Sequence, residues 1–160
     1  MINRLLFRLT AGLPCRLITL PSGPYLERYW LGRWFGYTAY LHRFVSPDGE
    51  RHLHNHPWHA RSLVLAGGYV EEVVTDLTAE GPLTERHRVR WWSAVPANKF
   101  HRIAAVEPGT WTLFVHAPRI PGKGWGFLQG REFTPDTTSP GPDWHRTAPA
   151  RGVIDENDLV

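Results

Sequence analysis

Four histidines fall within the stretch HLHNHPWH (52–59), at His52, His54, His56 and His59. Side chains two positions apart on a β-strand project from the same face, so His54 and His56 would project together, about 7 Å apart along the strand. Two imidazoles on one face can bind a divalent ion when a third ligand arrives from elsewhere in the chain. His101, which ends the segment PANKFH (96–101), is the candidate for that ligand. The spacing therefore predicts a metal site at His54, His56 and His101.

The two other histidines of the stretch are candidates for a fourth ligand. His52 shares strand parity with His54 but stands one step further out, and His59 follows Pro57 and Trp58, where the chain is expected to turn. Either could equally be a histidine of the site wall or of the surface, so the spacing leaves these alternatives open.

The elements that must position these histidines are expected to be β-strands. From residue 25 to residue 117 the hydrophobic spacing favours roughly seven short strands with turn signals every eight to twelve residues, a pattern typical of an antiparallel sandwich or barrel. Only the N-terminal segment is expected to be helical, and the chain from Pro118 onward is rich in Pro and Gly. We therefore predict an all-β fold.

Composition restricts the classes of function. The chain has 160 residues, 42% of them hydrophobic and 21% charged, which is typical of one soluble globular domain. The net charge of +3 comes from scattered arginines without a dense basic stripe, so nucleic acid is not an expected partner. No stretch is long enough to span a membrane. Cys15, the only cysteine, excludes an internal disulfide and fits a cytoplasmic protein.

Two motifs, in order along the chain, resemble those of the cupins. His54-Asn55-His56, with Gly67 as the closing glycine, resembles the first cupin motif, and Pro96-Ala97-Asn98-Lys99-Phe100-His101 resembles the second, with Asn98 in place of a glycine. Asn tolerates positive φ better than most residues, so this replacement is physically mild. The resemblance covers residues 36–117 and implies a cupin double-stranded β-helix, that is, a jelly-roll barrel.

More narrowly, the chain resembles a set of small bacterial and phage cupins. The segments that carry it are PYLERYWL (24–31), YLHRF (40–44), HNHPW (54–58), GGYVEE (67–72), WTLF (111–114) and WGF (125–127). This narrower resemblance implies the fold and no particular reaction.

The chain departs from the first cupin motif at its glutamate. Ala60 and Arg61 occupy the positions at which that metal-binding carboxylate is expected. Three interpretations remain open: a three-histidine site similar to that of the thiol-dioxygenase cupins, which bind ferrous iron without a carboxylate; a fourth ligand from His52 or His59; or no metal at all.

The wall of the site has four further candidates. Arg43 and Arg61 could bind an anionic substrate if they face the barrel mouth, or pair with surface glutamates if they do not. Tyr40 and His116 lie on neighbouring predicted strands and could line the pocket. We predict all four as substrate-binding residues.

The resemblance and the missing carboxylate together favour a mononuclear Fe(II), O2-dependent dioxygenase or other oxygenase, an oxidoreductase acting on a small anionic molecule. His54, His56 and His101 would be its metal-binding and catalytic residues, with Zn, Ni or Mn as alternative ions. One alternative function is a cupin isomerase, epimerase or cyclase that uses a histidine as base, with or without a Lewis-acid metal. Another is a non-catalytic small-ligand-binding protein.

The predicted organisation is one domain in three parts. Residues 1–35 form an N-terminal arm that includes a short helix and packs on the barrel, residues 36–135 form the cupin barrel, and residues 136–160 form an extended C-terminal tail. The Pro/Gly-rich segment before that tail is expected to wrap the barrel. Because many cupins pair through edge strands, a homodimer is possible.

Overall fold

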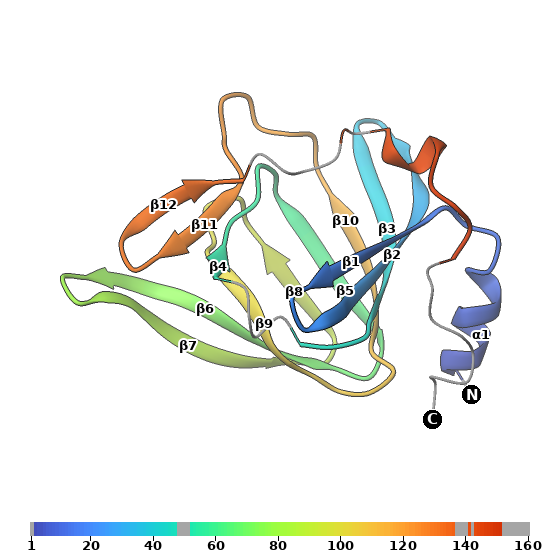
Figure 1. Cartoon of the computed structure of the whole chain (residues 1–160), viewed down its shortest axis with the longest axis horizontal. Helices are drawn as coiled ribbons and strands as arrows, with labels where there is room; N and C mark the ends of the chain where they lie inside the picture. The colour runs from blue at the N-terminus through green and yellow to red at the C-terminus, as the bar shows by residue number, and fades with distance from the viewer. Residues whose placement is uncertain (1, 48–51, 137–140, 142, 152–160) are drawn as a thin grey trace.

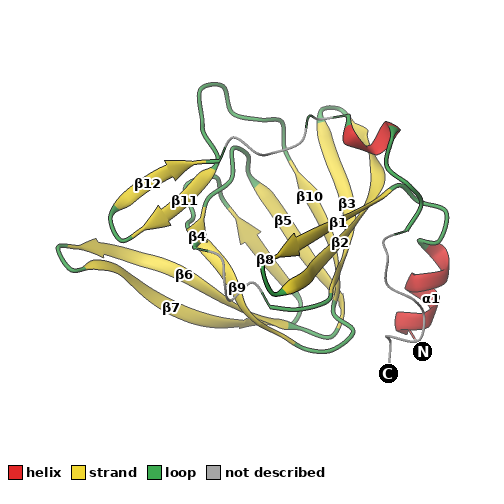
Figure 2. Ribbon diagram, viewed as in Figure 1, coloured by secondary structure: helices red, strands yellow, loops and turns green. Residues whose placement is uncertain are grey.

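Two antiparallel β-sheets face each other in the computed structural model, which describes residues 2–47, 52–136, 141 and 143–151. Within these residues each sheet has six strands (Figure 1). Figure 2 shows how little of the chain is helical: a short helix near the N-terminus and one 3-10 turn near the C-terminus. The predicted all-β jelly-roll barrel is therefore confirmed.

The first sheet contains the N-terminal strands and the central part of the barrel. Its strands, in spatial order, are β1 (Cys15–Leu20), β2 (Gly23–Trp34), β3 (Tyr37–Phe44), β10 (Trp111–His116), β5 (Ala60–Ala66) and β8 (Trp92–Val95). The second sheet contains β12 (Glu132–Pro135), β11 (Gly126–Gln129), β4 (Leu53–His54), β9 (His101–Val106), β6 (Tyr69–Thr78) and β7 (Gly81–Val89). Strand order differs from chain order in both sheets, as a jelly roll requires.

A hydrophobic core fills the space between the two sheets. Its buried members are Tyr25, Leu26, Phe44, Val64, Tyr69, Val89 and Ile103. Alternation along each strand then identifies the inner face: Val64 points into this core while its neighbour Leu63 is exposed. The same parity can be followed from Phe44 along β3 and from Tyr69 along β6.

A second hydrophobic cluster lies on the outer face of the first sheet, beneath helix α1 (Ile2–Leu9). It consists of the buried side chains of Phe7, Cys15, Tyr29 and Trp111. The Thr10 hydroxyl closes the helix by donating hydrogen bonds to the carbonyl oxygens of Leu6 and Phe7, at 2.9 and 3.1 Å. The described part of the chain contains no helix with the length and apolarity needed to cross a membrane.

The boundaries of the barrel differ from those predicted. Strands β1 and β2 are hydrogen-bonded members of the first sheet, so the barrel starts at Cys15 and only helix α1 and its following turn pack on it as an arm. Within the predicted strand 51–56, only β4 is a strand; residue 51 lies outside the described part.

The described part of the C-terminal segment contacts the barrel. The 3-10 turn η1 (Trp144–Arg146) places His145 flat against the Trp30 ring, with centroids 3.8 Å apart. Ala150 forms a backbone bridge with Pro14. Residues 152–160 of the predicted tail lie outside the described residues.

Candidate metal centre

Three histidine side chains meet in the second sheet. His54 ends β4 and is paired in register with His101, the first residue of β9, while His56 follows two residues after β4. One nitrogen of each ring lies within 4.8 Å of the others. His54 and His101 are buried and His56 is half-buried. The structure thus brings together the three residues that the spacing predicted.

The distance between two rings of this cluster suits a bound metal ion. His56 Nε2 and His101 Nε2 are 3.0 Å apart. Metal–nitrogen bonds of about 2.0–2.1 Å place two adjacent imidazole ligands of one ion about 3 Å apart. In the metal-free rings this separation is that of a hydrogen bond between the two nitrogens. Three imidazoles are also a donor set that suits a divalent transition-metal ion.

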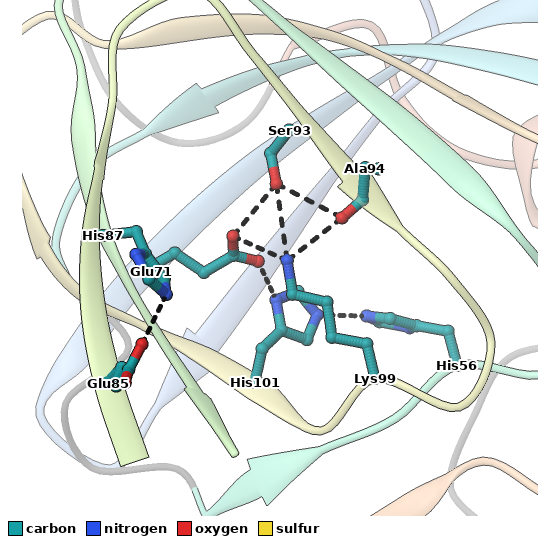
Figure 3. A network of polar contacts seen from close by, with 8 residues as sticks. All are labelled: His56, Glu71, Glu85, His87, Ser93, Ala94, Lys99 and His101. Carbon is teal, nitrogen blue, oxygen red and sulfur yellow. Dashed lines mark hydrogen bonds and ion pairs between the residues drawn. The ribbon is translucent and has the colours of Figure 1, made fainter. Parts of the chain in front are cut away.

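Each ring of the cluster is held by a contact outside it. His54 Nδ1 lies 3.3 Å from the His52 carbonyl oxygen. The His56 ring stacks on Trp58 with centroids 4.3 Å apart and planes 8° apart. His101 Nδ1 lies 2.5 Å from Glu71 Oε1 (Figure 3). Partners of this kind fix the orientation of metal-binding imidazoles.

Glu71 is the centre of a buried polar network. Lys99 Nζ donates to Glu71 Oε2 at 2.8 Å and Ser93 Oγ donates to the same oxygen at 2.9 Å (Figure 3). Burial alone would raise the pKa of Glu71, but the hydrogen bonds and charges of His101 and Lys99 outweigh it and lower that pKa to about 2. The carboxylate is therefore ionised at neutral pH and faces the ammonium of Lys99.

The two charged side chains behind His101 carry no net charge together. Imidazoles bind a metal in their neutral form, and the charges of Glu71 and Lys99 cancel each other. A divalent ion at the three histidines would keep its full double positive charge. Such a centre attracts anionic ligands.

Aromatic and imidazole rings line the inner face of the first sheet next to the cluster. Tyr40 and His42 share strand parity with the core residue Phe44, and so face inward. Trp58 links this wall to the metal centre, because it stacks on His56 and lies 4.6 Å from the His116 ring centroid. Tyr40 lies 5.8 Å from the same ring.

The two wall histidines are neutral imidazoles. Burial lowers the pKa of His116, although a hydrogen bond from its Nδ1 to the Ala117 carbonyl oxygen, at 2.8 Å, opposes the shift. Complete burial places the pKa of His42 well below its usual range, and His42 Nε2 accepts a hydrogen bond from Arg28 Nε at 3.1 Å.

The two arginines predicted to bind substrate lie on the outer face of the first sheet. Arg43 has the opposite parity to Phe44; its guanidinium pairs with Glu27 at 3.2 Å, and its Cζ lies 5.2 Å from the Phe7 ring centroid of helix α1. On β5, Arg61 has the opposite parity to the inward-facing Val64. Its side chain is exposed, and its Cζ lies 5.7 Å from the Trp92 ring centroid. Both point away from the three histidines, which corrects their predicted place in the pocket wall.

The two candidates for a fourth ligand also lie outside the cluster. His59 is exposed, and its Nδ1 accepts a hydrogen bond from the Ala97 backbone N–H at 3.2 Å. His52 is exposed and contacts the site through its carbonyl oxygen. Among the described residues the potential ligand set has three histidines and no carboxylate.

Glu71 is the important residue that the sequence interpretation missed. Glu71 and Glu72 were expected only as surface partners for arginines, and adjacent glutamates do not reveal which one faces inward. Strand parity contains the signal: Tyr69 belongs to the core, so Glu71 shares its inward face and Glu72 points outward to Arg102 and Arg86. Reading parity from a known core residue would have identified it.

The fold and the three-histidine site define a barrel of the cupin type. No family model matches the chain, and no curated protein matches it by sequence. Among solved structures it is similar to Streptomyces albus HEPD with 2-hydroxyethylphosphonate and Fe(II) bound, with a TM-score of 0.51 and 13% identity over 67% of this chain and 25% of that one.

Two further solved structures are similar at lower TM-scores. They are Fe(II) HppE (0.48, 14% identity, 65% of this chain and 55% of that one) and a putative mannose-6-phosphate isomerase from Ralstonia eutropha JMP134 (0.47, 21% identity, 62% and 91%). The chain thus spans about half the length of HppE and a quarter of HEPD. At these identities the likeness concerns the fold alone.

Proposed function

We propose that this protein is a mononuclear Fe(II), O2-dependent oxygenase that acts on a small anionic molecule. The observation that carries the proposal is the cluster of His54, His56 and His101, which has no carboxylate ligand among the described residues. Three neutral ligands leave positions on the ion open for both substrate and O2. They also leave its charge intact for binding an anion.

The protein's own residues have distinct tasks in this proposal. His54, His56 and His101 would hold the iron, which supplies the redox chemistry with O2 when bound. Glu71 orients His101 through the contact at Nδ1. Trp58 covers one face of the His56 ring and limits the approach of water from that side. Tyr40 and His116 are proposed to contact the substrate from the opposite wall.

A second candidate function rests on the tautomer of His116. Its Nδ1 donates to the Ala117 carbonyl oxygen, so the proton is on Nδ1 and Nε2 has a free lone pair. Burial keeps this imidazole neutral at pH 7. A neutral histidine beside Tyr40 is suited to act as a general base, as an isomerase or epimerase with a Lewis-acid metal would need.

Metal analysis of protein purified without chelators tests the proposal. We expect close to one iron per chain, loss of that iron in His101→Ala, and its retention in the matched control His59→Ala, whose imidazole is exposed and outside the cluster. O2 uptake by the Fe(II) protein with candidate small acids and thiols is the second measurement. Equally tight zinc or nickel without O2 uptake would favour the isomerase. Absence of bound metal after reconstitution with Fe(II) would contradict both functions.

A further inference from the structure

We propose that Glu71 is a positioning residue that fixes the tautomer of His101, and that Lys99 makes its negative charge indispensable for this role. This inference rests on the proposed metal site and extends it beyond the three ligands. The first cupin motif lacks its metal-binding carboxylate in this chain. Glu71 instead supplies a carboxylate that contacts the ring of a ligand, His101, and does not contact the ion.

The first step concerns which nitrogen of His101 carries a proton. The Glu71 carboxylate accepts from Lys99 Nζ at 2.8 Å and from Ser93 Oγ at 2.9 Å, and a carboxylate paired with an ammonium only accepts hydrogen bonds. The 2.5 Å contact between Glu71 Oε1 and His101 Nδ1 therefore requires a proton on Nδ1. In the neutral ring Nε2 then has no proton and can only accept, and Nε2 is the atom that lies 3.0 Å from His56 Nε2. The contact at Nδ1 therefore leaves Nε2 able to bind a metal.

The second step concerns the other oxygen of Glu71. Oε2 accepts from Lys99 Nζ at 2.8 Å and from Ser93 Oγ at 2.9 Å. The Lys99 ammonium is a donor with no acceptor capacity, and its side chain is only 14% exposed. Lys99 Nζ also donates to the Ala94 carbonyl oxygen at 3.0 Å, so its partners are all acceptors and a group at position 71 keeps this contact only by presenting an oxygen.

These two demands together predict an unusual effect of Glu71→Gln. The amide has one oxygen, and Lys99 takes it, so the NH2 group turns toward His101. An NH2 group donates, so Nδ1 of His101 must accept and its proton must move to Nε2. The proton then occupies the side of the ring on which the metal binds. This isosteric substitution, at a residue that does not contact the ion, would thus prevent His101 from binding the metal.

Two matched variants separate this effect from ordinary destabilisation. Glu72→Gln changes the neighbouring residue, which is also buried but faces outward to Thr84, Arg86 and Arg102. Lys99→Met combined with Glu71→Gln removes the ammonium that selects the amide oxygen. The amide can then turn its oxygen to His101, so the double variant should regain what the single variant lost.

The test has a direct readout in metal-free protein. Long-range ¹H–¹⁵N NMR spectra of the histidine rings, recorded in alkaline buffer, report which His101 nitrogen is protonated. We expect a proton on Nδ1 in the wild type and in Glu72→Gln, and an unprotonated Nδ1 in Glu71→Gln. A wild-type His101 without a proton on Nδ1, or a Glu71→Gln spectrum identical to the wild type, would overturn the inference.

Co(II) titration of the folded variants provides the second readout. Loss of a partner to a metal-binding histidine costs about 10–100-fold in metal affinity, so Glu71→Gln should bind Co(II) more weakly by that factor. Glu72→Gln should match the wild type, and the double variant should bind more tightly than Glu71→Gln alone. A double variant weaker than the single one would contradict the role of Lys99. Because neither readout requires turnover, absence of O2 uptake would overturn the oxygenase and leave this inference standing.

Discussion

Arg43 and Arg61 show that the surroundings of an arginine on a strand decide its role. Both arginines stand on strands of the first sheet, but Arg43 is buried against a fully buried Glu27 and Arg61 is exposed. Glu27 Oε2 also accepts a hydrogen bond from the Tyr29 hydroxyl at 2.6 Å, and burial followed by that contact raises the pKa of Tyr29. The Arg43–Glu27 pair thus belongs to the structural support of the barrel, apart from the metal centre.

Removal of the Arg43 guanidinium should leave the Glu27 carboxylate buried without its counter-ion. Arg43→Met is expected to lower the free energy of unfolding by about 3–5 kcal/mol, while iron content per folded chain stays at the wild-type value. Urea denaturation followed by tryptophan fluorescence measures the loss. In the control, Arg61→Met, the change should stay within about 0.5 kcal/mol because that side chain is exposed. Equal effects of the two substitutions would refute the assignment.

At the residue scale, local spacing predicted the three histidines but not their surroundings. His54 and His56 are two positions apart, and His101 occupies a motif position, so short-range pattern was sufficient. The inward direction of Glu71 and the outward direction of Arg43 depend on which face of each strand meets the other sheet. That choice is set by the packing of distant residues, such as Tyr69 and Phe44, and is absent from the local pattern.

At the scale of elements, the turn between β5 and β6 depends on Gly67. Its φ is +68°, a backbone conformation that residues with a Cβ adopt only with strain. A Cβ placed there would also clash with the Thr110 hydroxyl oxygen, and that hydroxyl exchanges hydrogen bonds with the Gly68 backbone. The turn and the segment before β10 are therefore fitted to each other.

Gly67→Ala is expected to destabilise the fold by more than backbone strain alone. Strain at positive φ costs about 1–2 kcal/mol, and the contact with Thr110 adds to it. Gly130→Ala is the matched control, because Gly130 has a φ of +58° with open space around its Cβ position. Thermal and urea unfolding of both variants should show the larger loss for Gly67→Ala. A loss in Gly130→Ala as large as that in Gly67→Ala would show that Thr110 is not a constraint.

Element boundaries were predicted less well than element types. The strands from 36 to 117 follow turn signals that are local in the sequence, such as Gly67-Gly68 and Pro108-Gly109. The segment 51–56 alternates over its whole length, yet only Leu53–His54 is a strand, because its neighbours β9 and β11 offer partners only there. Backbone pairing with distant strands decided this boundary.

At the scale of the whole molecule, helix α1 covers the outer face of the first sheet while the metal centre lies in the second. Phe7 is fully buried against Tyr29 and Trp111, and Arg151 donates a hydrogen bond to its carbonyl oxygen. Strands β1 and β2, which fall within the predicted arm of residues 1–35, complete the sheet onto which this helix packs. The packing of helix α1 and the histidine cluster therefore belong to different sheets of the barrel.

This separation predicts that helix α1 can be loosened without loss of the site. Phe7→Ala should lower the free energy of unfolding by about 3–5 kcal/mol, as expected for a large aromatic side chain removed from a core. The folded fraction should still bind one metal ion per chain. Urea denaturation and metal analysis of the same sample check both statements. Loss of metal from protein that remains folded would show that the two sides of the barrel are coupled.

The central claim is that three histidine rings bind a single ion, and a crystal structure of the Fe(II)-loaded protein measured at the iron absorption edge tests it most directly. The account predicts one anomalous peak at about 2.0–2.2 Å from a ring nitrogen of each of His54, His56 and His101. Glu71 should remain on the far side of the His101 ring, bonded to Nδ1. A peak elsewhere, or an iron bound directly by the Glu71 carboxylate, would contradict the account.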